Sequence, residues 1–182
     1  MSTTSTFIFI CGMPGSGKST LGARLAKYLK YSFSDLDNII ELQQERSIRE
    51  IFEGKGEDYF RLCEHMALKS FIADNEDKKS SILSLGGGTP CFHNNSEIIK
   101  EHGISVFLDT PLELIAERML AADEISKRPL LAGTDNHGII EALNNKYIQR
   151  FPFYEKSHIK IKGDESLEFI SSLIESFAAT KR

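Results

Sequence analysis

The hydrophobic positions of the chain follow two periodicities, one typical of buried strands and one typical of amphipathic helices. Residues 6–11 form a short run of β-branched and aromatic residues that ends at a glycine, which predicts a strand buried on both faces. Leu21, Leu25 and Leu29 then recur every four residues, so residues 19–30 are predicted to form a helix with one apolar stripe. The chain therefore begins with a strand, a glycine-rich loop and a helix.

The same alternation continues to the end of the chain. Further strands are predicted at residues 31–34, 81–85, 104–108 and 158–161. Helices are predicted in pieces over 37–52, then over 57–74, 110–120, the stretch that ends at 150, and 166–178. Alternating strands and helices indicate an α/β fold, a three-layer αβα sandwich with a central parallel sheet of about five strands and ligands at the carboxyl ends of the strands.

One segment does not fit either periodicity. Residues 121–136 mix charged residues with Pro129 and Gly133, and we interpret them as a mobile excursion between two helices. The sequence contains no internal repeat and no low-complexity stretch. With 182 residues, the chain is long enough for one compact domain and short for two, so a single domain over 1–182 is predicted.

Composition narrows the function classes. The chain is 41% hydrophobic and 26% charged, as in globular proteins, and its net charge of -4 with dispersed basic residues argues against a nucleic-acid partner. Cys11, Cys63 and Cys91 form no CxxC pair, which favours a reducing cytoplasm. Neither a secretory start nor an apolar run long enough to span a bilayer is present in the pattern, so no membrane association is expected.

The glycine-rich loop carries the first candidate chemistry. It matches GxxxxGK[ST] in full, between a predicted strand and a predicted helix, and comprises Gly12, Met13, Pro14, Gly15, Ser16, Gly17, Lys18, Ser19 and Thr20. Its backbone N–H groups and the helix N-terminus suit nucleotide phosphates, Lys18 reaches the β and γ phosphates, and the Ser19 hydroxyl is placed to ligate Mg²⁺. The alternative is a plain glycine turn with a solvated lysine, which the flanking strand and helix disfavour.

Further motifs follow in a fixed order along the chain, and they allow a family to be named. They are Asp35-Leu36-Asp37, Phe60-Arg61-Leu62-Cys63-Glu64, Gly86-Gly87-Gly88, Arg128-Pro129-Leu130-Leu131, and Arg150 four residues before Tyr154. With the phosphate loop, they make the chain from Phe7 to about Tyr154 resemble the shikimate kinases, small enzymes of the P-loop fold that is similar to that of nucleoside monophosphate kinases. The glycine triplet separates this family from most other small P-loop kinases.

The resemblance implies roles on the acceptor side. Asp37 binds the acceptor hydroxyl and takes its proton, Arg61 and Arg150 clamp the acceptor carboxylate, and Glu64 orients Arg61. The triplet Gly86, Gly87 and Gly88 approaches the acceptor closely because no Cβ intervenes. Phe52 and Phe60 form an apolar wall beside the ring, and helices at about 37–75 make up the substrate-binding region.

The resemblance also implies roles on the nucleotide side. Asp35 lies near the Mg²⁺ together with Ser19, Arg118 stacks on adenine, and Arg128 belongs to a mobile lid at about 121–136 that closes over the nucleotide. Lys18, Asp37 and Arg128 are then the catalytic residues. The expected reaction converts MgATP and shikimate into ADP and shikimate 3-phosphate, a step towards chorismate and the aromatic amino acids, in a monomeric cytoplasmic enzyme.

Alternatives remain open for single motifs and for the function. Either aspartate of the DxD motif could cap the following helix, Arg61 and Glu64 could be a surface ion pair, and the three glycines could be a flexible loop. A kinase for gluconate or a nucleoside monophosphate would reuse the same phosphate loop. A protein that kept the fold and lost turnover would be a non-catalytic regulator, against which the intact Lys18, Asp37 and Arg128 argue.

Overall fold

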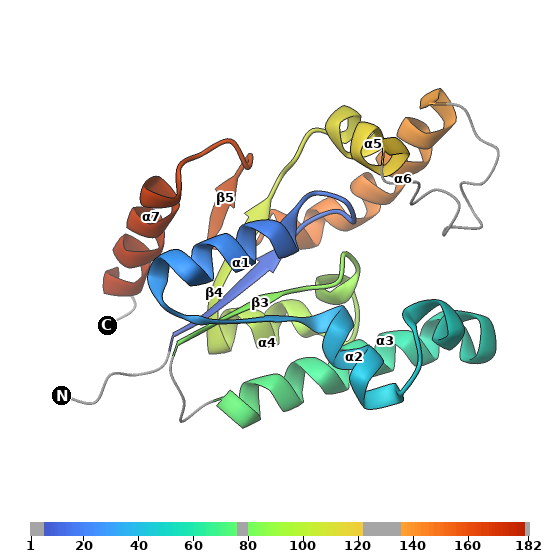
Figure 1. Ribbon diagram of the computed structural model, residues 1–182, viewed down its shortest axis with the longest axis horizontal. Coiled ribbons are helices and arrows are strands. Elements are labelled where there is room, and N and C mark those ends of the chain that lie inside the picture. Colours follow the sequence, from blue (N-terminus) through green and yellow to red (C-terminus); the bar gives the residue numbers. More distant parts are fainter. Residues whose placement is uncertain (1–5, 76–79, 122–135, 181–182) are drawn as a thin grey trace.

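The structure, a computed structural model, describes residues 6–75, 80–121 and 136–180 (Figure 1). Its centre is a five-stranded sheet in the order β2-β3-β1-β4-β5, in which all four pairings are parallel. The strands are β1 (Phe7–Cys11), β2 (Ser32–Asp35), β3 (Ser81–Ser84), β4 (Gly103–Leu108) and β5 (Ile159–Ile161). The prediction of a parallel sheet of about five strands is confirmed.

Helices cover both faces of this sheet, which confirms the three-layer prediction. One face carries α1 (Lys18–Leu29) and α7 (Leu167–Thr180), and the other carries α3 (Ile48–Asn75), α4 (Asn95–His102) and α6 (Asn136–Tyr154). Two further helices, α2 (Leu36–Gln44) and α5 (Leu112–Ala121), pack beside α3 and α6 respectively. No described helix has the length and apolarity needed to cross a membrane.

Strand β1 shows how the sequence produces two cores. Phe7, Phe9 and Cys11 point into the core on the α3 side, whereas Ile8 and Ile10 point into the core on the α1 side. Successive side chains of a strand point to opposite faces, so a strand with helices on both sides must be apolar at every position. Each large side chain buried in this way contributes about 1.5–3 kcal/mol of transfer free energy.

The elements differ from the sequence prediction at several boundaries. Strand β2 lies one residue later than predicted, so that Asp35 ends the strand and begins the turn into α2. The break predicted between residues 52 and 57 is confirmed, since Gly56 has a non-helical φ of 81° and kinks α3 there. Helix α4 was not predicted, and α6 continues four residues past Arg150 to Tyr154, with Pro152 near its end.

Parallel strands bring the candidate motifs to one edge of the sheet. The phosphate loop follows β1, the Asp35-Leu36-Asp37 motif ends β2, and the glycine triplet follows β3 one residue after its end. Since β3 pairs with both β1 and β2, these three chain segments leave neighbouring strands in the same direction. Residues 122–135, which hold most of the predicted lid and include Arg128, lie outside the described residues.

Candidate active site

The loop between β1 and α1 has the backbone geometry of a phosphate cradle. Gly12, Gly15 and Gly17 have φ values of 147°, 80° and 99°, a region that only glycine enters readily. Gly17 is the N-cap of α1, and the first turn of that helix contains no acidic residue. The N-terminal N–H groups of α1 therefore face a place suited to an anion.

Lys18 and Ser16 are polar residues buried in this loop. The Lys18 side chain is 8% exposed, and its Nζ donates a hydrogen bond to the carbonyl oxygen of Met13 at 2.9 Å. Burial lowers the pKa of Lys18 to about 8, although the nearby acidic groups, Asp37 foremost, oppose that shift. The Ser16 hydroxyl is buried without a hydrogen-bond partner among the described residues. Both groups would gain an acceptor from a phosphate oxygen.

Three oxygen-bearing side chains converge beside the start of α1. The Ser19 hydroxyl donates to Asp35 Oδ2 at 2.5 Å and lies 3.3 Å from the Ser84 hydroxyl at the end of β3. The other oxygen of Asp35 accepts the backbone N–H of Asp37 at 3.0 Å, so Asp35 also caps α2. The helix-cap interpretation of Asp35 is thus confirmed, and its other carboxylate oxygen faces Ser19. Hydroxyl and carboxylate oxygens are the ligands that Mg²⁺ prefers, and the residues present fit that ion.

The glycine triplet is packed against charged side chains from three helices. A Cβ built on Gly86 would lie 3.1 Å from Asp37 Oδ1, and one on Gly88 would lie 2.5 Å from Arg61 Nη1. A Cβ on Gly87 would lie 3.0 Å from Arg150 Nη1 and 2.6 Å from Cδ of Pro14 in the phosphate loop. One predicted acceptor-binding group therefore lies against each glycine, and the phosphate loop adjoins the middle one.

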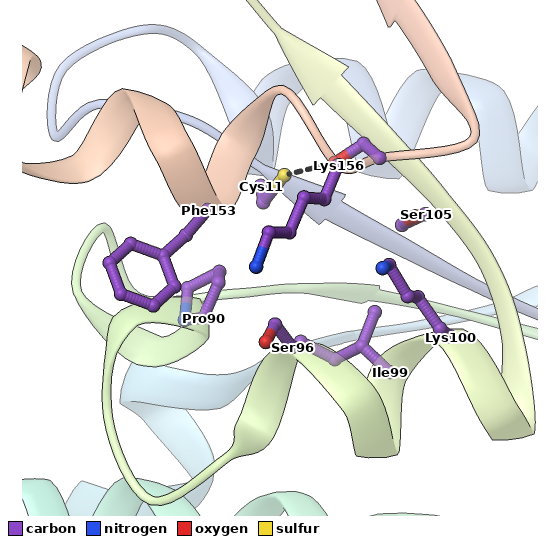
Figure 2. Close-up of a pocket in the computed structure, with 9 residues that line it drawn as sticks. Cys11, Pro90, Ser96, Ile99, Lys100, Ser105, Phe153 and Lys156 are labelled. Carbon is purple, nitrogen blue, oxygen red and sulfur yellow. Dashed lines mark hydrogen bonds between the residues drawn. The ribbon is translucent and has the colours of Figure 1, made fainter.

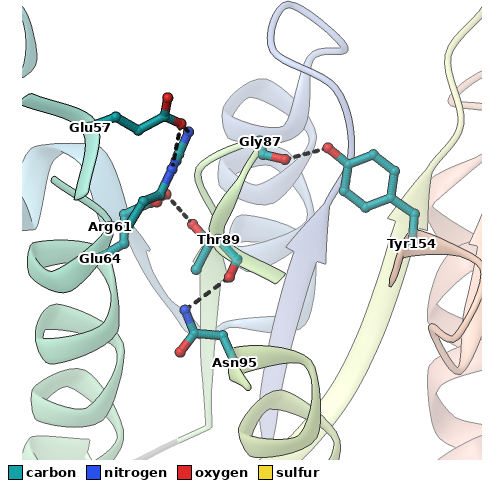
Figure 3. Close-up of polar contacts among 7 residues, drawn as sticks. All are labelled: Glu57, Arg61, Glu64, Gly87, Thr89, Asn95 and Tyr154. Carbon is teal, nitrogen blue, oxygen red and sulfur yellow. Dashed lines mark hydrogen bonds and ion pairs between the residues drawn. The ribbon is translucent and has the colours of Figure 1, made fainter. Parts of the chain in front are cut away.

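Arg61 is held in a fixed orientation on α3 (Figure 3). Its Nη1 donates to Glu64 Oε2 at 2.6 Å, while its Nε and Nη2 donate to Glu57 Oε1 at 3.1 and 2.7 Å. The guanidinium carbon also lies 4.5 Å from the ring centre of Phe92. Burial alone would lower the pKa of Arg61, but the charges and hydrogen bonds of Glu64 and Glu57 together outweigh it and raise that pKa. This pair is buried and is no surface ion pair.

Arg150 approaches the triplet from the opposite side, on α6. Its Nη1 atom is buried and has no hydrogen-bond partner among the described residues. One turn further along α6, the fully buried Tyr154 donates its hydroxyl hydrogen to the carbonyl oxygen of Gly87 (Figure 3). An unpaired guanidinium N–H is costly unless a ligand completes it, so this atom marks a place for an acceptor group such as a carboxylate oxygen.

Asp37 retains solvent access at the start of α2 and lies close to several charges. Desolvation by the surrounding elements, followed by the negative charges of Asp35 and Glu64, raises the pKa of Asp37 to about 6, and Lys18 opposes the shift. A carboxylate with such a pKa is ionised at pH 7 yet basic enough to accept a proton from a hydroxyl group.

Arg118 lies at the nucleotide side, on α5. Its Nη1 donates to the carbonyl oxygen of Ser16 at 2.9 Å, and the Thr110 hydroxyl donates to the same oxygen at 2.9 Å. A Cβ built on Gly17 would lie 3.3 Å from Arg118 Nη1. The guanidinium is therefore fixed against the phosphate loop from outside, in a position from which it can meet a nucleotide.

Comparison with known proteins agrees with this geometry. The family model described as shikimate kinase matches residues 14–178. The chain belongs to the shikimate kinase family. It is 37% identical to a shikimate kinase of Clostridium botulinum strain Langeland over 174 residues, which are 96% of this chain and 97% of that one. As a member of this family, the protein is an ATP-dependent phosphotransferase.

Two solved shikimate kinases share the fold over nearly the whole chain. The enzyme from Acinetobacter baumannii, solved in complex with shikimate, aligns with a TM-score of 0.81 at 30% identity and covers 98% of this chain and 96% of that one. The enzyme from Bacteroides thetaiotaomicron aligns with a TM-score of 0.78 at 30% identity, with 96% and 97% covered. The P-loop fold predicted from the sequence is thus confirmed.

The two aromatic residues predicted as a ring wall lie side by side in this shikimate kinase fold. The ring centres of Phe52 and Phe60 are 4.6 Å apart. Phe60 is buried and packs in the core on the α3 side, whereas Phe52 is half-buried against that core. The structure therefore gives Phe60 a packing role and leaves Phe52 partly exposed.

Sequence reasoning missed three polar residues at this site. Ser84 faces Ser19 from β3, Thr89 donates its hydroxyl to Glu64 Oε1 at 2.5 Å, and Asn95 donates to the carbonyl oxygen of Thr89 at 2.9 Å. Each is buried, and none belongs to a motif with characteristic spacing. The sequence did contain one signal for Ser84, a polar residue at the end of an apolar strand. In the structure, Ser84 pairs in register with Asp35, which brings it to the same site.

A small pocket lies between α4 and the C-terminal end of α6 (Figure 2). The amines of Lys100 and Lys156 point towards it, and the Cys11 thiol, 3.2 Å from the Ser157 hydroxyl, lines its base. Burial raises the pKa of Cys11 to about 11, so this thiol is protonated and a poor nucleophile at neutral pH. The lining contains none of the residues predicted for nucleotide or acceptor binding, and we assign the pocket no catalytic role.

Proposed function

We propose that this protein transfers the γ-phosphoryl group of MgATP to the 3-hydroxyl of shikimate and yields ADP and shikimate 3-phosphate, in the route to chorismate and the aromatic amino acids. One observation carries the acceptor assignment. Asp37, Arg150 and Arg61 each lie against one glycine of the triplet, and the same triplet adjoins Pro14 of the phosphate loop. A hydroxyl-binding carboxylate and two guanidinium groups therefore face one place beside the phosphates.

The nucleotide phosphates bind in the loop of residues 12–20. Backbone N–H groups of the loop and the N-terminus of α1 hold the phosphate oxygens, and the buried Lys18 moves its hydrogen bonds from Met13 to the β and γ phosphates. The Ser16 hydroxyl, which has no hydrogen-bond partner in the described part of the chain, gains one from a phosphate oxygen. Arg118, fixed against the loop through Ser16, covers the base.

Ser19 and Asp35 would hold the magnesium ion, and Ser84 supports the Ser19 hydroxyl. When bound, the ion neutralises charge on the β and γ phosphate oxygens. The hydroxyl of Ser19 already points towards the carboxylate of Asp35, so the oxygen donors are arranged before any ion binds. Asp35 cannot turn away freely, because its second oxygen caps α2.

The acceptor is an anion held by two arginines. Arg61 has three of its N–H groups committed to Glu57 and Glu64 among the described residues, so two of five remain for a carboxylate. Arg150 Nη1 supplies a further donor from the other side. Two positive groups fixed on separate helices favour a carboxylate over a neutral sugar, since a neutral acceptor would leave the buried Arg150 Nη1 without a charged partner.

Asp37 orients the acceptor hydroxyl and accepts its proton while the new oxygen–phosphorus bond forms and the bond to the leaving ADP oxygen breaks. Positioning and charge neutralisation supply most of the rate. By family resemblance, Arg128 of the lid at about 121–136 closes over the transferred group and excludes water. One chain supplies every other group at the site, which supports a monomeric enzyme, and we place it in the cytoplasm.

The test is a coupled assay of ADP release with purified protein, MgATP and a panel of acceptors. We expect turnover with shikimate, and rates at least a hundredfold lower with gluconate, a nucleoside monophosphate or water. ³¹P NMR of the product should show a phosphate monoester on the shikimate ring. A faster reaction with gluconate or a nucleoside monophosphate would overturn the acceptor assignment, and no turnover with any acceptor would indicate a non-catalytic protein.

A further inference from the structure

The loop between β3 and α4 is held from two sides by the helices that carry the two arginines (Figure 3). On α3, Glu64 Oε1 accepts a hydrogen bond from the Thr89 hydroxyl at 2.5 Å. On α6, Tyr154 donates to the carbonyl oxygen of Gly87. The loop thus bridges the helix of Arg61 and the helix of Arg150, and its conformation sets how the two guanidinium groups face each other.

The contact between Thr89 and Glu64 is buried, and it leaves Glu64 little freedom. Thr89 is fully buried and Glu64 is 1% exposed, so water does not compete for either group. The two carboxylate oxygens are divided, with Oε1 towards Thr89 and Oε2 towards Arg61 at 2.6 Å. Rotation of the carboxylate would break both hydrogen bonds, and charge-assisted bonds of this kind are among the strongest in proteins.

Asn95, the first residue of α4, holds Thr89 in place. Its side-chain nitrogen donates to the carbonyl oxygen of Thr89 at 2.9 Å, and its side-chain oxygen lies 2.8 Å from Nδ1 of His65. Because the Asn95 nitrogen is the donor to Thr89, its oxygen accepts, so the hydrogen of the His65 ring is on Nδ1. Asn95 is fully buried, and both ends of its amide have partners.

We propose that Thr89 and Asn95 are positioning residues for the acceptor carboxylate. Thr89 holds Glu64 directly, and Asn95 holds Thr89. Glu64 in turn fixes the plane of the Arg61 guanidinium, so that its two uncommitted N–H groups meet a carboxylate without prior reorientation. Neither residue touches the acceptor. The inference rests on the proposed function, because it assigns the affinity for an anionic acceptor to this chain of contacts.

A positioning role and a purely stabilising role for Thr89 would change different measured quantities. A buried hydroxyl that only filled space could be replaced by a methyl group of the same shape at little cost. Here the hydroxyl is bonded to Glu64, the buried one of the two carboxylates that orient Arg61, so its loss first affects acceptor binding. The nucleotide side shares none of these bonds, since Lys18, Ser19 and Arg118 hold other partners.

The experiment compares Thr89→Val with Thr89→Ser and with a matched variant on the nucleotide side, Thr110→Val. Thr110 is also buried, and its hydroxyl donates to Ser16 of the phosphate loop. For Thr89→Val we expect the KM for shikimate to rise about tenfold, with kcat and the KM for MgATP within about twofold of wild type. Thr89→Ser keeps the hydroxyl and should restore the KM, whereas Thr110→Val should raise the KM for MgATP alone.

Asn95→Ala provides a second test of the inference. We expect it to raise the KM for shikimate by a smaller factor, about threefold. Thermal unfolding of each variant records any loss of fold separately. A KM for shikimate at the wild-type value in both Thr89→Val and Asn95→Ala overturns the inference, as do equal changes in the KM values of both substrates. If the wild-type protein itself does not phosphorylate shikimate, the proposed function fails and this inference fails with it, whereas an active wild type with unaffected variants overturns the inference alone.

Discussion

The nucleotide side and the acceptor side of this site are built from different parts of the polypeptide. The nucleotide side is nine consecutive residues, 12–20, in which glycines at positive φ and the N-terminus of α1 present backbone N–H groups. The acceptor side collects charged side chains from α2, α3 and α6 around the loop after β3. Backbone N–H groups bind any phosphate, so the phosphate loop indicates only that a nucleotide binds. The charged side chains of the acceptor side are what can select one acceptor over another.

The two sides also differ in how they tolerate change. The backbone N–H groups of the phosphate loop are local, and from outside the loop Thr110 and Arg118 donate hydrogen bonds to its Ser16 carbonyl oxygen. On the acceptor side, Arg61, Glu64 and Thr89 depend on one another across two elements. A single substitution there disturbs a network, and double substitutions should be non-additive. The following substitutions are expected to affect one side and spare the other.

The largest effect is expected for Asp37→Asn. The amide cannot accept the acceptor proton, so kcat should fall by about 10²–10⁴. Nucleotide affinity, measured by isothermal titration with ADP and Mg²⁺, should stay within about threefold because the phosphate loop is untouched. Asp58→Asn, an exposed acid on α3, is the matched control and should retain wild-type kcat. Near-normal turnover of Asp37→Asn would remove Asp37 from the reaction.

Arg61→Ala should weaken acceptor binding by about 2–5 kcal/mol, read from the KM for shikimate, because the acceptor carboxylate loses its partner. Glu64 is also left charged and buried, which should reduce the free energy of unfolding by about 3–5 kcal/mol in urea titrations. Arg49→Ala is the comparison on the same helix, where the ion pair with Glu53 is exposed and is worth under about 1 kcal/mol. Equal losses for the two variants would contradict the buried clamp.

The sequence predicts the residues and geometry of the nucleotide side more completely than those of the acceptor side, for physical reasons. The phosphate loop is a local pattern between a strand and a helix, so its residues and their geometry follow from spacing alone. The contacts of the glycine triplet with Arg61 and Arg150 join residues more than 25 and 60 positions apart, and only the order of strands in the sheet brings them together. These residues were identified by the family resemblance and not by any periodicity of the sequence.

What the pattern could not predict were single buried polar residues and a short helix. Helix α4 has eight residues and buries only Asn95 and Ile99, so it has no apolar stripe to recognise. Thr89 and Asn95 look like ordinary loop residues until their partners on α3 are known. The predicted boundary between two helices, in contrast, is present, because Gly56 has non-helical backbone angles inside α3.

A smaller effect is expected for Gly88→Ala. The φ of Gly88 is -98°, which alanine adopts without strain, so only the clash of the new Cβ with Arg61, 2.5 Å from Nη1, should matter. Since Glu57 and Glu64 prevent Arg61 from moving aside, the KM for shikimate should rise about tenfold. Gly54→Ala, where a Cβ meets nothing within 4 Å, should leave the kinetic constants unchanged and stabilise the helix by about 0.5–1 kcal/mol. A normal KM for Gly88→Ala would show that Arg61 is free to shift.

The smallest expected difference between the two sides is in how kcat/KM for each substrate depends on pH. Desolvation and neighbouring acids raise the pKa of Asp37 to about 6, and the free enzyme needs this group ionised, so kcat/KM for shikimate should fall up to tenfold per pH unit below about pH 6. Burial lowers the pKa of Lys18 to about 8, and phosphate binding needs it charged, so kcat/KM for MgATP should fall above about pH 8. Asp37→Asn should lose the acidic limb and keep the basic one. Profiles of the same shape for both substrates would mean that the two sides share one titrating group, and the division between backbone recognition and side-chain selection would then not hold.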